Sequence, residues 1–338
     1  MKAVGFTRSL PISDPESLLD FDAPMPAASG HDLLVEVKAV SVNPVDYRVR
    51  RDMGPANLGT RILGYDAAGI VTAVGADCRL FKPGDEVYYA GELTRQGSNS
   101  QFQLVDERIV GAKPRKLSFA DAAAMPLTLI TAWEALHVQL RVRPDGSDAG
   151  RTLLILGGAG GVGCITTQLA KLAGLKVIST ASRAESVAQC KRFGADLVLD
   201  HKLDLKAQLA DAGHPTVDLI FSCAELDAYF KLATEILAPF GGLCTIVAPN
   251  TPVDLRLFMI KALRYSHEFM FTRSMFRTPD MIEQHRLLDA AAAMFDRGVL
   301  TSTRSQTVGT INAANLRKAH AQLESTHTLG KLVLEGWG

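Results

Sequence analysis

The 338-residue sequence has few cysteines and no excess of either charge, and both absences exclude functions. Its five cysteines are dispersed, with no CxxC pair, which is typical of a chain without structural disulfides in a reducing cytoplasm. The 36 Lys and Arg residues balance 36 Asp and Glu residues, so the formal net charge is zero. This balance disfavours a nucleic-acid partner, which would be bound through bulk positive charge.

Long apolar runs and an export signal are also missing. Residues 152–170 carry no charge, but five glycines and several threonines interrupt them, and a bilayer span needs about 20 predominantly apolar residues. The first residues contain no apolar run of the kind that signal peptides have. We therefore expect no membrane partner and a cytoplasmic location.

The pattern of apolar residues changes along the chain. The first 125 residues contain short β-branched and aromatic runs between glycines, at 33–40, 70–75 and 86–89, which is typical of an all-β domain. After residue 150, apolar runs alternate with helical patterns, which predicts βαβ units and a parallel sheet. The expected strands are 153–156, 177–180, 197–199, 217–221 and 243–247, and the expected helices between them are 164–172, 185–193 and 226–237.

Several further elements flank this alternating region. Ser118 is a suitable N-cap for a helix that Pro126 would end. The remaining expected elements are helices at 131–140, 278–295 and 312–324, and a strand at 331–334.

The strongest local motif is a glycine loop. Gly158, Gly160 and Gly163 match GxGxxG, with Gly161 and Val162 between them. The loop follows an apolar run and precedes a helical pattern, which is the context of a dinucleotide-binding fingerprint. There the glycines allow the turn, the approach of a pyrophosphate and close helix–strand packing, and the helix N-terminus attracts the phosphates. The alternative is a turn that serves packing alone.

The end of the second expected strand indicates which dinucleotide is bound. NAD sites place a carboxylate about 20 residues beyond the loop, where it binds the ribose 2′-hydroxyl. This sequence has Ser182 and Arg183 there instead. Because a guanidinium pairs with phosphate through several donors, we predict NADPH as the cofactor, bound by both residues. The alternative is that Arg183 is only a solvated surface residue.

Several segments together resemble a known family. They are 43–46 (Asn-Pro-Val-Asp), 64–69 (Gly-Tyr-Asp-Ala-Ala-Gly), 82–87, 122–126, 129–132, the glycine loop, 193–196, 267–276 and 330–331. With them the chain resembles the medium-chain dehydrogenase/reductase superfamily, and in particular its zinc-type alcohol dehydrogenase-like branch beside the quinone oxidoreductases. The resemblance implies an α/β fold with a GroES-like β domain (1–124), a doubly wound Rossmann domain that binds NADP(H) (125–299) and a C-terminal return to the first domain (300–338). It also implies a cleft between the domains and a homodimer.

The metal ligands of that family are missing. In its Gly-His-Glu triplet, Tyr65 replaces the histidine and Asp66 the glutamate. There is no cysteine near 44–46, and residues 89–103 lack the four cysteines of a structural zinc lobe. Because zinc needs three or four N, S or O ligands from the protein, we predict no metal site.

Without a metal, the sequence favours reduction of an electron-poor acceptor. We expect hydride transfer from NADPH to a quinone or an α,β-unsaturated carbonyl, with hydrogen-bond donors stabilising the charge on oxygen. The candidate catalytic residues are Tyr65, Tyr47 and Asn43. The resemblance places Tyr65 in the cleft, where it could donate to the substrate, lets Tyr47 face the nicotinamide, and lets Asn43 contact the substrate or the nicotinamide carboxamide. The alternative role of the two tyrosines is packing. For Asp66 and Asp46, the alternative to acting as acids is a structural role, in which they accept hydrogen bonds from backbone N–H groups.

Other candidates concern the cofactor. The resemblance places Thr131 and Phe271 near the nicotinamide and lets Lys331 reach a cofactor phosphate, the alternative being a solvated lysine. The resemblance also implies that residues 269–276 lie at the end of a strand. This segment either lines an apolar substrate pocket or forms a dimer contact. Two other functions remain open: a zinc-dependent alcohol dehydrogenase, and a non-catalytic NADPH-binding protein.

Overall fold

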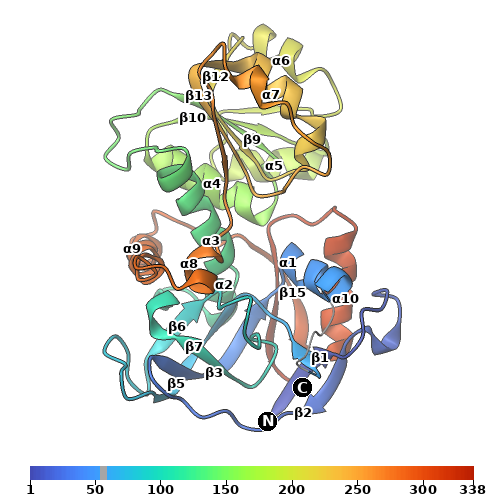
Figure 1. Ribbon diagram of the computed structural model, residues 1–338, viewed down its shortest axis with the longest axis vertical. Coiled ribbons are helices and arrows are strands. Elements are labelled where there is room, and N and C mark those ends of the chain that lie inside the picture. Colours follow the sequence, from blue (N-terminus) through green and yellow to red (C-terminus); the bar gives the residue numbers. More distant parts are fainter. Residues whose placement is uncertain (54–58) are drawn as a thin grey trace. The chain divides into compact units, whose positions relative to one another are not determined.

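The computed structural model describes residues 1–53 and 59–338 and confirms the predicted α/β class (Figure 1). The chain forms two compact units, residues 1–130 with 271–338 (unit 1) and residues 131–270 (unit 2). The predicted domain boundaries, 124/125 and 299/300, differ from the boundaries between these two units, 130/131 and 270/271. No helix in the described ranges is long and apolar enough to cross a membrane.

Unit 1 is built on two sheets. The larger has the strand order β15-β16-β3-β5-β6-β8, with β7 also paired to β3, and the smaller has the order β2-β1-β4. The strands are β1 (Lys2–Phe6), β2 (Leu19–Asp22), β3 (Asp32–Ser41), β4 (Arg61–Ile62), β5 (Ala67–Val74), β6 (Glu86–Tyr89), β7 (Phe102–Asp106), β8 (Val110–Ala112), β15 (Arg304–Ile311) and β16 (Lys331–Trp337). All pairs except β15 with β16 are antiparallel. The C-terminal strand β16 thus joins the sheet through β3.

Unit 1 also contains short helices around these sheets. They are α1 (Pro44–Arg48), α2 (Phe119–Ala123), α8 (Thr272–Phe276), α9 (Glu283–Asp296) and α10 (Ala313–Glu324). One-turn segments lie at Pro15–Ser17 and Glu107–Ile109, and a π-helical segment at Val49–Met53. Ser118 caps α2 as predicted, because its side chain accepts a hydrogen bond from the backbone of Asp121.

Unit 2 is a six-stranded parallel sheet. Its strands are β9 (Thr152–Leu156), β10 (Lys176–Thr180), β11 (Leu197–Leu199), β12 (Val217–Ser222), β13 (Leu237–Thr245) and β14 (Arg264–His267). Their order, β11-β10-β9-β12-β13-β14, corresponds to 3-2-1-4-5-6 in chain order. That order defines the Rossmann sheet, in which ligands bind at the carboxyl ends of the strands where the order reverses.

Four helices pack against this sheet, and they are α4 (Gly161–Leu172), α5 (Ala184–Arg192), α6 (Leu205–Asp211) and α7 (Phe230–Ile236) (Figure 1). One-turn segments lie at Leu226–Ala228 and Leu255–Phe258. The first boundary between the units, 130/131, falls within α3 (Pro126–Trp133), which continues as a π-helical segment at Glu134–Gln139. The predicted helix over 131–140 therefore begins too late. Pro126 starts a helix because the first helical position needs no N–H donor.

Two further predictions differ from the structure. The expected strand over 269–276 is wrong, since β14 ends at His267 and α8 begins at Thr272. The helix expected over 278–295 begins at Glu283 and belongs to unit 1 rather than to the central domain. It is held there because the Tyr88 hydroxyl donates to the Leu288 carbonyl at 2.6 Å.

Candidate functional site

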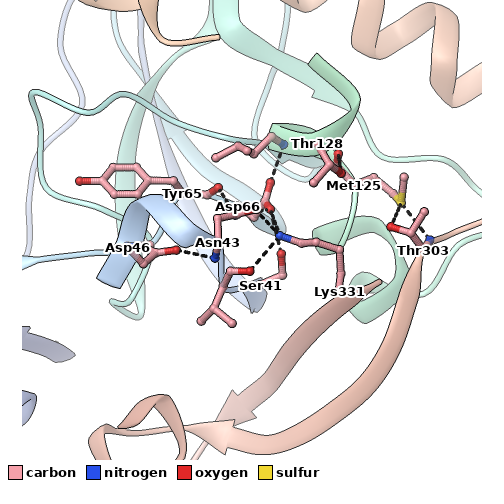
Figure 2. Close-up of polar contacts among 12 residues, drawn as sticks. Ser41, Asn43, Asp46, Tyr65, Asp66, Met125, Thr128, Thr303 and Lys331 are labelled. Carbon is pink, nitrogen blue, oxygen red and sulfur yellow. Dashed lines mark hydrogen bonds and ion pairs between the residues drawn. The ribbon is translucent and has the colours of Figure 1, made fainter. Parts of the chain in front are cut away.

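Asp66 is the centre of a buried hydrogen-bond network in unit 1 (Figure 2). Its Oδ2 accepts from Ser41 Oγ at 2.8 Å, Asn43 Nδ2 at 2.7 Å and Lys331 Nζ at 2.9 Å. Its Oδ1 accepts from the backbone N–H of Leu127 at 2.7 Å. The carboxylate thus joins the end of β3, the start of β5, the first turn of α3 and the start of β16. Its donors all come from the protein.

Lys331 supplies the positive charge of this network. The residue is 4% exposed, and its ammonium also donates to the carbonyl oxygens of Val42, at 3.0 Å, and of the Asn43 side chain, at 2.5 Å. An ammonium has three donors, and all three are used. This position favours an internal ion pair over the predicted contact with a cofactor phosphate.

Asn43 holds the backbone of the candidate donor. Besides its bond to Asp66, its Nδ2 donates to the Tyr65 carbonyl oxygen at 3.0 Å. Its side-chain oxygen accepts from Lys331, and Asn43 is itself buried. With both amide hydrogens engaged inside the protein, Asn43 is better suited to positioning Tyr65 than to the predicted contact with substrate.

Asp46 closes the other side of this segment. Its Oδ2 accepts from the Asn43 backbone N–H at 2.7 Å, and its Oδ1 accepts from the Gly64 N–H at 3.0 Å. Burial raises the pKa of Asp46 to about 7, while these N–H donors and the charge of Lys331 act in the opposite direction. The Asp46 carboxyl therefore fixes the backbone at Asn43 and at Gly64 by accepting their hydrogen bonds. This is the structural role that the sequence left open as the alternative.

Tyr65 is the predicted site residue whose side chain stays available. Its ring is fully buried and meets Phe271 edge-to-face, with a centroid distance of 5.4 Å. Figure 2 shows the ring directed away from the Lys331 network. Its hydroxyl has no hydrogen-bond partner within residues 1–53 and 59–338. Burial raises the pKa of Tyr65 to about 12, with the Arg61 guanidinium acting in the opposite direction, so the phenol is a neutral donor at physiological pH.

The remaining predicted residues lie apart from Asp66. Tyr47 is half-buried on α1, and Phe271, predicted near the nicotinamide, is buried against Tyr65. Thr131 is buried in the part of α3 that belongs to unit 2. The structure thus brings Asn43, Tyr65, Phe271 and Lys331 together in unit 1, while the predicted cofactor loop lies in unit 2.

The glycine loop lies at the carboxyl ends of β9 and β10. Gly157, with φ +87°, donates its N–H to Thr180 Oγ1 at 3.0 Å, and Gly160 is the N-cap of α4. A Cβ on Gly163 would lie 2.6 Å from the carbonyl oxygens of Gly157 and Gly158, so only glycine fits there. A Cβ on Gly160 would come no closer than 3.7 Å to another group. The loop therefore presents open space and the first N–H groups of a twelve-residue helix, which fits a pyrophosphate.

The end of β10 carries the predicted phosphate ligands. Ser182 and Arg183 are both half-buried, and Arg183 is the N-cap residue of α5. Its Nε lies 3.5 Å from Glu185 Oε1, a carboxylate that the sequence already places at the start of this helix. The strand order puts these side chains beside the glycine loop, where the ribose of a bound dinucleotide would lie.

The residues at the family's metal position do not fit a zinc ion. Within the described ranges, no three His, Cys, Asp or Glu side chains are grouped so that they could hold a metal, and the sequence of residues 54–58 contains none of these types. Asp66, in the place of the family's glutamate, is engaged by four protein donors. The described cysteines are all free thiols, and burial raises the pKa of each of them above its ordinary value.

Comparisons with known proteins cover the whole chain. An alcohol dehydrogenase GroES-like domain family matches residues 29–132, and a zinc-binding dehydrogenase family matches residues 161–287. A zinc-type alcohol dehydrogenase-like protein of Staphylococcus aureus is 41% identical over 335 residues, which cover 99% of both proteins. A crystallised Rhizobium etli protein, provisionally named a zinc-dependent alcohol dehydrogenase, is 50% identical, with a TM-score of 0.96 over 100% of this chain and 98% of that one.

A more distant relative has a more specific name. An NADPH-dependent alkenal/one oxidoreductase of Arabidopsis thaliana chloroplasts is 35% identical over 234 residues, 66% of this chain and 58% of that protein.

Proposed function

Because the chain belongs to the zinc-type alcohol dehydrogenase-like proteins of the medium-chain dehydrogenase/reductase superfamily, we propose that it is a zinc-independent, NADPH-dependent reductase of α,β-unsaturated carbonyls or quinones. The oxidoreductase class follows from the family. The cofactor, the acceptor and the independence from zinc are the proposal. The name of the Arabidopsis relative supports the choice of NADPH and of an enone.

The Asp66 network is the observation that carries the proposal. In a zinc enzyme a metal polarises the substrate oxygen as a Lewis acid. Here the carboxylate at that position is engaged by protein donors, and the residue beside it offers a phenol. A hydrogen bond from a phenol suits a carbonyl oxygen that becomes negative during the reaction.

The roles of the residues follow from these positions. When bound, NADPH would supply the hydride that adds to the β-carbon of the enone, which would place negative charge on the carbonyl oxygen. Tyr65 Oη–H donates to that oxygen, and Asn43 and Asp46 hold the backbone of Tyr65 and of Gly64 in place. The glycine loop orients the dinucleotide, and a solvent proton completes the product at the α-carbon.

Replacing Tyr65 by phenylalanine tests the proposed donor. We expect kcat for enone reduction to fall by about a hundredfold to a thousandfold, because one donor to the developing oxyanion is lost. Tyr89→Phe is the matched control, since Tyr89 is also fully buried in unit 1 with a hydroxyl that lacks a partner in the described residues. Steady-state oxidation of NADPH, followed by its absorbance, measures both variants. Equal rates for Tyr65→Phe and the unmodified protein would return Tyr65 to a packing role.

Replacing Arg183 by alanine tests the choice of cofactor. We expect the KM for NADPH to rise by a factor that corresponds to about 1–3 kcal/mol, while the KM for NADH changes little. The reason is that the guanidinium pairs only with the 2′-phosphate. Arg192→Ala, which removes an exposed arginine from the last turn of the same helix, serves as the control. Similar increases for both cofactors would contradict the phosphate role.

We also propose a homodimer that forms through the β14 edge of unit 2. Beside this edge strand, five large apolar side chains are exposed, namely Phe240, Leu255, Leu257, Met259 and Ile260. Such a patch is typical of a protein–protein contact. Light scattering should give twice the chain mass for the unmodified protein and a single chain mass for Met259→Asp/Ile260→Asp. A monomeric unmodified protein at micromolar concentration would rule out this contact.

A further inference from the structure

Arg61 is a buried guanidinium without a carboxylate partner. The residue is 6% exposed, and its Nη2 donates to the Leu93 carbonyl oxygen at 3.0 Å. Its Nε has no hydrogen-bond partner, and the residue forms no ion pair, within the part of the chain that is described. Residues 54–58 contain no Asp or Glu. Because arginine stays charged at neutral pH, a buried and unpaired guanidinium is costly unless a ligand supplies negative charge.

The local backbone directs Arg61 toward Tyr65. Side chains alternate between the two faces of an extended segment, so Arg61 points away from its neighbours Thr60 and Ile62. Those two neighbours line a separate pocket in unit 1. The guanidinium lies close enough to the Tyr65 hydroxyl to oppose the rise in the pKa of that group. The cation is therefore turned away from that pocket and lies near the proposed donor.

Asn99 adds an uncommitted amide beside this segment. It is 1% exposed, and neither Oδ1 nor Nδ2 has a partner in residues 1–53 or 59–338. Its backbone N–H donates to the Leu63 carbonyl at 2.8 Å, which fixes it against residues 61–65. Gly64, with φ +113°, makes room for it, because a Cβ there would lie 2.9 Å from Asn99 Oδ1.

We propose that Arg61 and Asn99 form a binding site for a carboxylate group, next to the Tyr65 hydroxyl. The guanidinium supplies a permanent positive charge, and the amide supplies a further N–H donor, which together suit the two oxygens of a carboxylate. A neutral carbonyl group would leave the charge of Arg61 without compensation. Neither residue takes part in the Asp66 network, so that network does not explain why Arg61 Nε and the side-chain amide of Asn99 are buried without partners in the described residues.

The position of this site next to Tyr65 indicates a substrate class. This step rests on the proposed function. If Tyr65 donates to the carbonyl oxygen, a carboxylate on the neighbouring carbon reaches Arg61 and Asn99, and the substrate is a 2-oxo-3-alkenoate. Hydride from NADPH forms a C–H bond at C4 and the C3–C4 π bond breaks. A proton from water adds at C3, giving the saturated 2-oxo acid and NADP⁺.

The test compares (E)-2-oxopent-3-enoate with its methyl ester, which has the same enone and no charge. We expect kcat/KM to be at least about tenfold higher for the acid in the unmodified protein, since hydrogen bonds to charged groups contribute that much. Arg61→Gln should abolish this preference and leave the ester within about twofold. The control Arg297→Gln, which removes an exposed arginine of unit 1, should keep the preference. Equal values for acid and ester in the unmodified protein would overturn the proposal.

Two further measurements keep the test decisive. Asn99→Asp places a carboxylate beside Arg61 and should remove the preference for the acid; it replaces Arg61→Gln if that variant does not fold. Calorimetry with 2-oxopentanoate, which cannot be reduced at a double bond, measures the carboxylate site without catalysis. Binding that depends on Arg61, with no enone reduced, would support the site and reject the proposed reductase. Reduction of enones with no acid preference, and binding unaffected by Arg61→Gln, would do the reverse.

Discussion

Lys331→Met should lower the free energy of unfolding by about 3–5 kcal/mol, because it leaves the Asp66 carboxylate buried and without its cation. Asp66 is fully buried, and the ammonium also satisfies two buried oxygens, of Val42 and Asn43. Without the ammonium, the Asn43 side chain loses a hydrogen bond and holds the backbone of Tyr65 less firmly. We therefore expect enone reduction to fall as well. Urea unfolding followed by circular dichroism measures the change in stability.

An exposed ion pair of the same type provides the control. Lys82 Nζ lies 2.8 Å from Asp85 Oδ1, and the Lys82 side chain is 81% exposed. Exposed pairs contribute little, so Lys82→Met should cost less than about 1 kcal/mol. If both variants lost the same small amount, the ammonium of Lys331 would not be the group that holds Asp66, and the account of this network would be wrong.

Gly160→Ala should weaken NADPH binding by about tenfold or more while leaving the free energy of unfolding nearly unchanged. The added methyl group meets no protein atom within 3.7 Å, so the loop keeps its conformation. The methyl group would instead occupy the space through which a pyrophosphate approaches the backbone. Fluorescence titration with NADPH and thermal unfolding without cofactor separate the two effects.

Gly163→Ala provides the comparison. Its Cβ would lie 2.6 Å from two carbonyl oxygens, so this variant should lose both stability and cofactor binding. Unchanged NADPH binding by Gly160→Ala would show that the dinucleotide does not approach the loop there, and the cofactor site would have to be placed elsewhere.

Structural features that depend only on residues close together in the sequence could be predicted. The parallel sheet of unit 2 follows from apolar runs that alternate with helical patterns, and the predicted strand over 197–199 matches β11 in both bounds. The glycine loop could be placed because its strand and helix flank it directly. Asn312 likewise caps α10 at the start of the helix predicted over 312–324.

The Asp66 network could not be derived in this way. Its members, Ser41, Asn43, Leu127 and Lys331, come from segments far apart in sequence, and only the sheet pairing of β3 with β5 and β16 joins three of these segments. The resemblance lets Lys331 reach a cofactor phosphate or remain solvated, and it implies nothing about the three acceptors that the ammonium meets inside the protein. A buried lysine has no local signal that separates it from a solvated one.

Arg61 and Asn99 were missed for a different reason. The resemblance concerns residues 89–103 only through the cysteines that this segment lacks, and it implies nothing about the polar residues there. Their placement depends on hydrogen bonds between residues 62–64 and 96–99, one of them to the Gln96 side chain, and no periodic pattern in the sequence predicts these bonds. The sequence shows only that Arg61 lies three residues before the replaced metal triplet, and its burial is known from the structure.

The central claim is that this chain reduces an activated double bond with NADPH and without zinc. The most direct measurement combines chelator-treated protein, analysed for metals by mass spectrometry, with (E)-pent-3-en-2-one and NADPH that carries deuterium at both C4 positions of the nicotinamide. The account predicts metal-free protein that transfers one deuterium to the β-carbon of the enone at the same rate as untreated protein. One stoichiometric zinc per chain whose removal abolishes activity, or tight NADPH binding with no transfer to any enone or quinone, would contradict it.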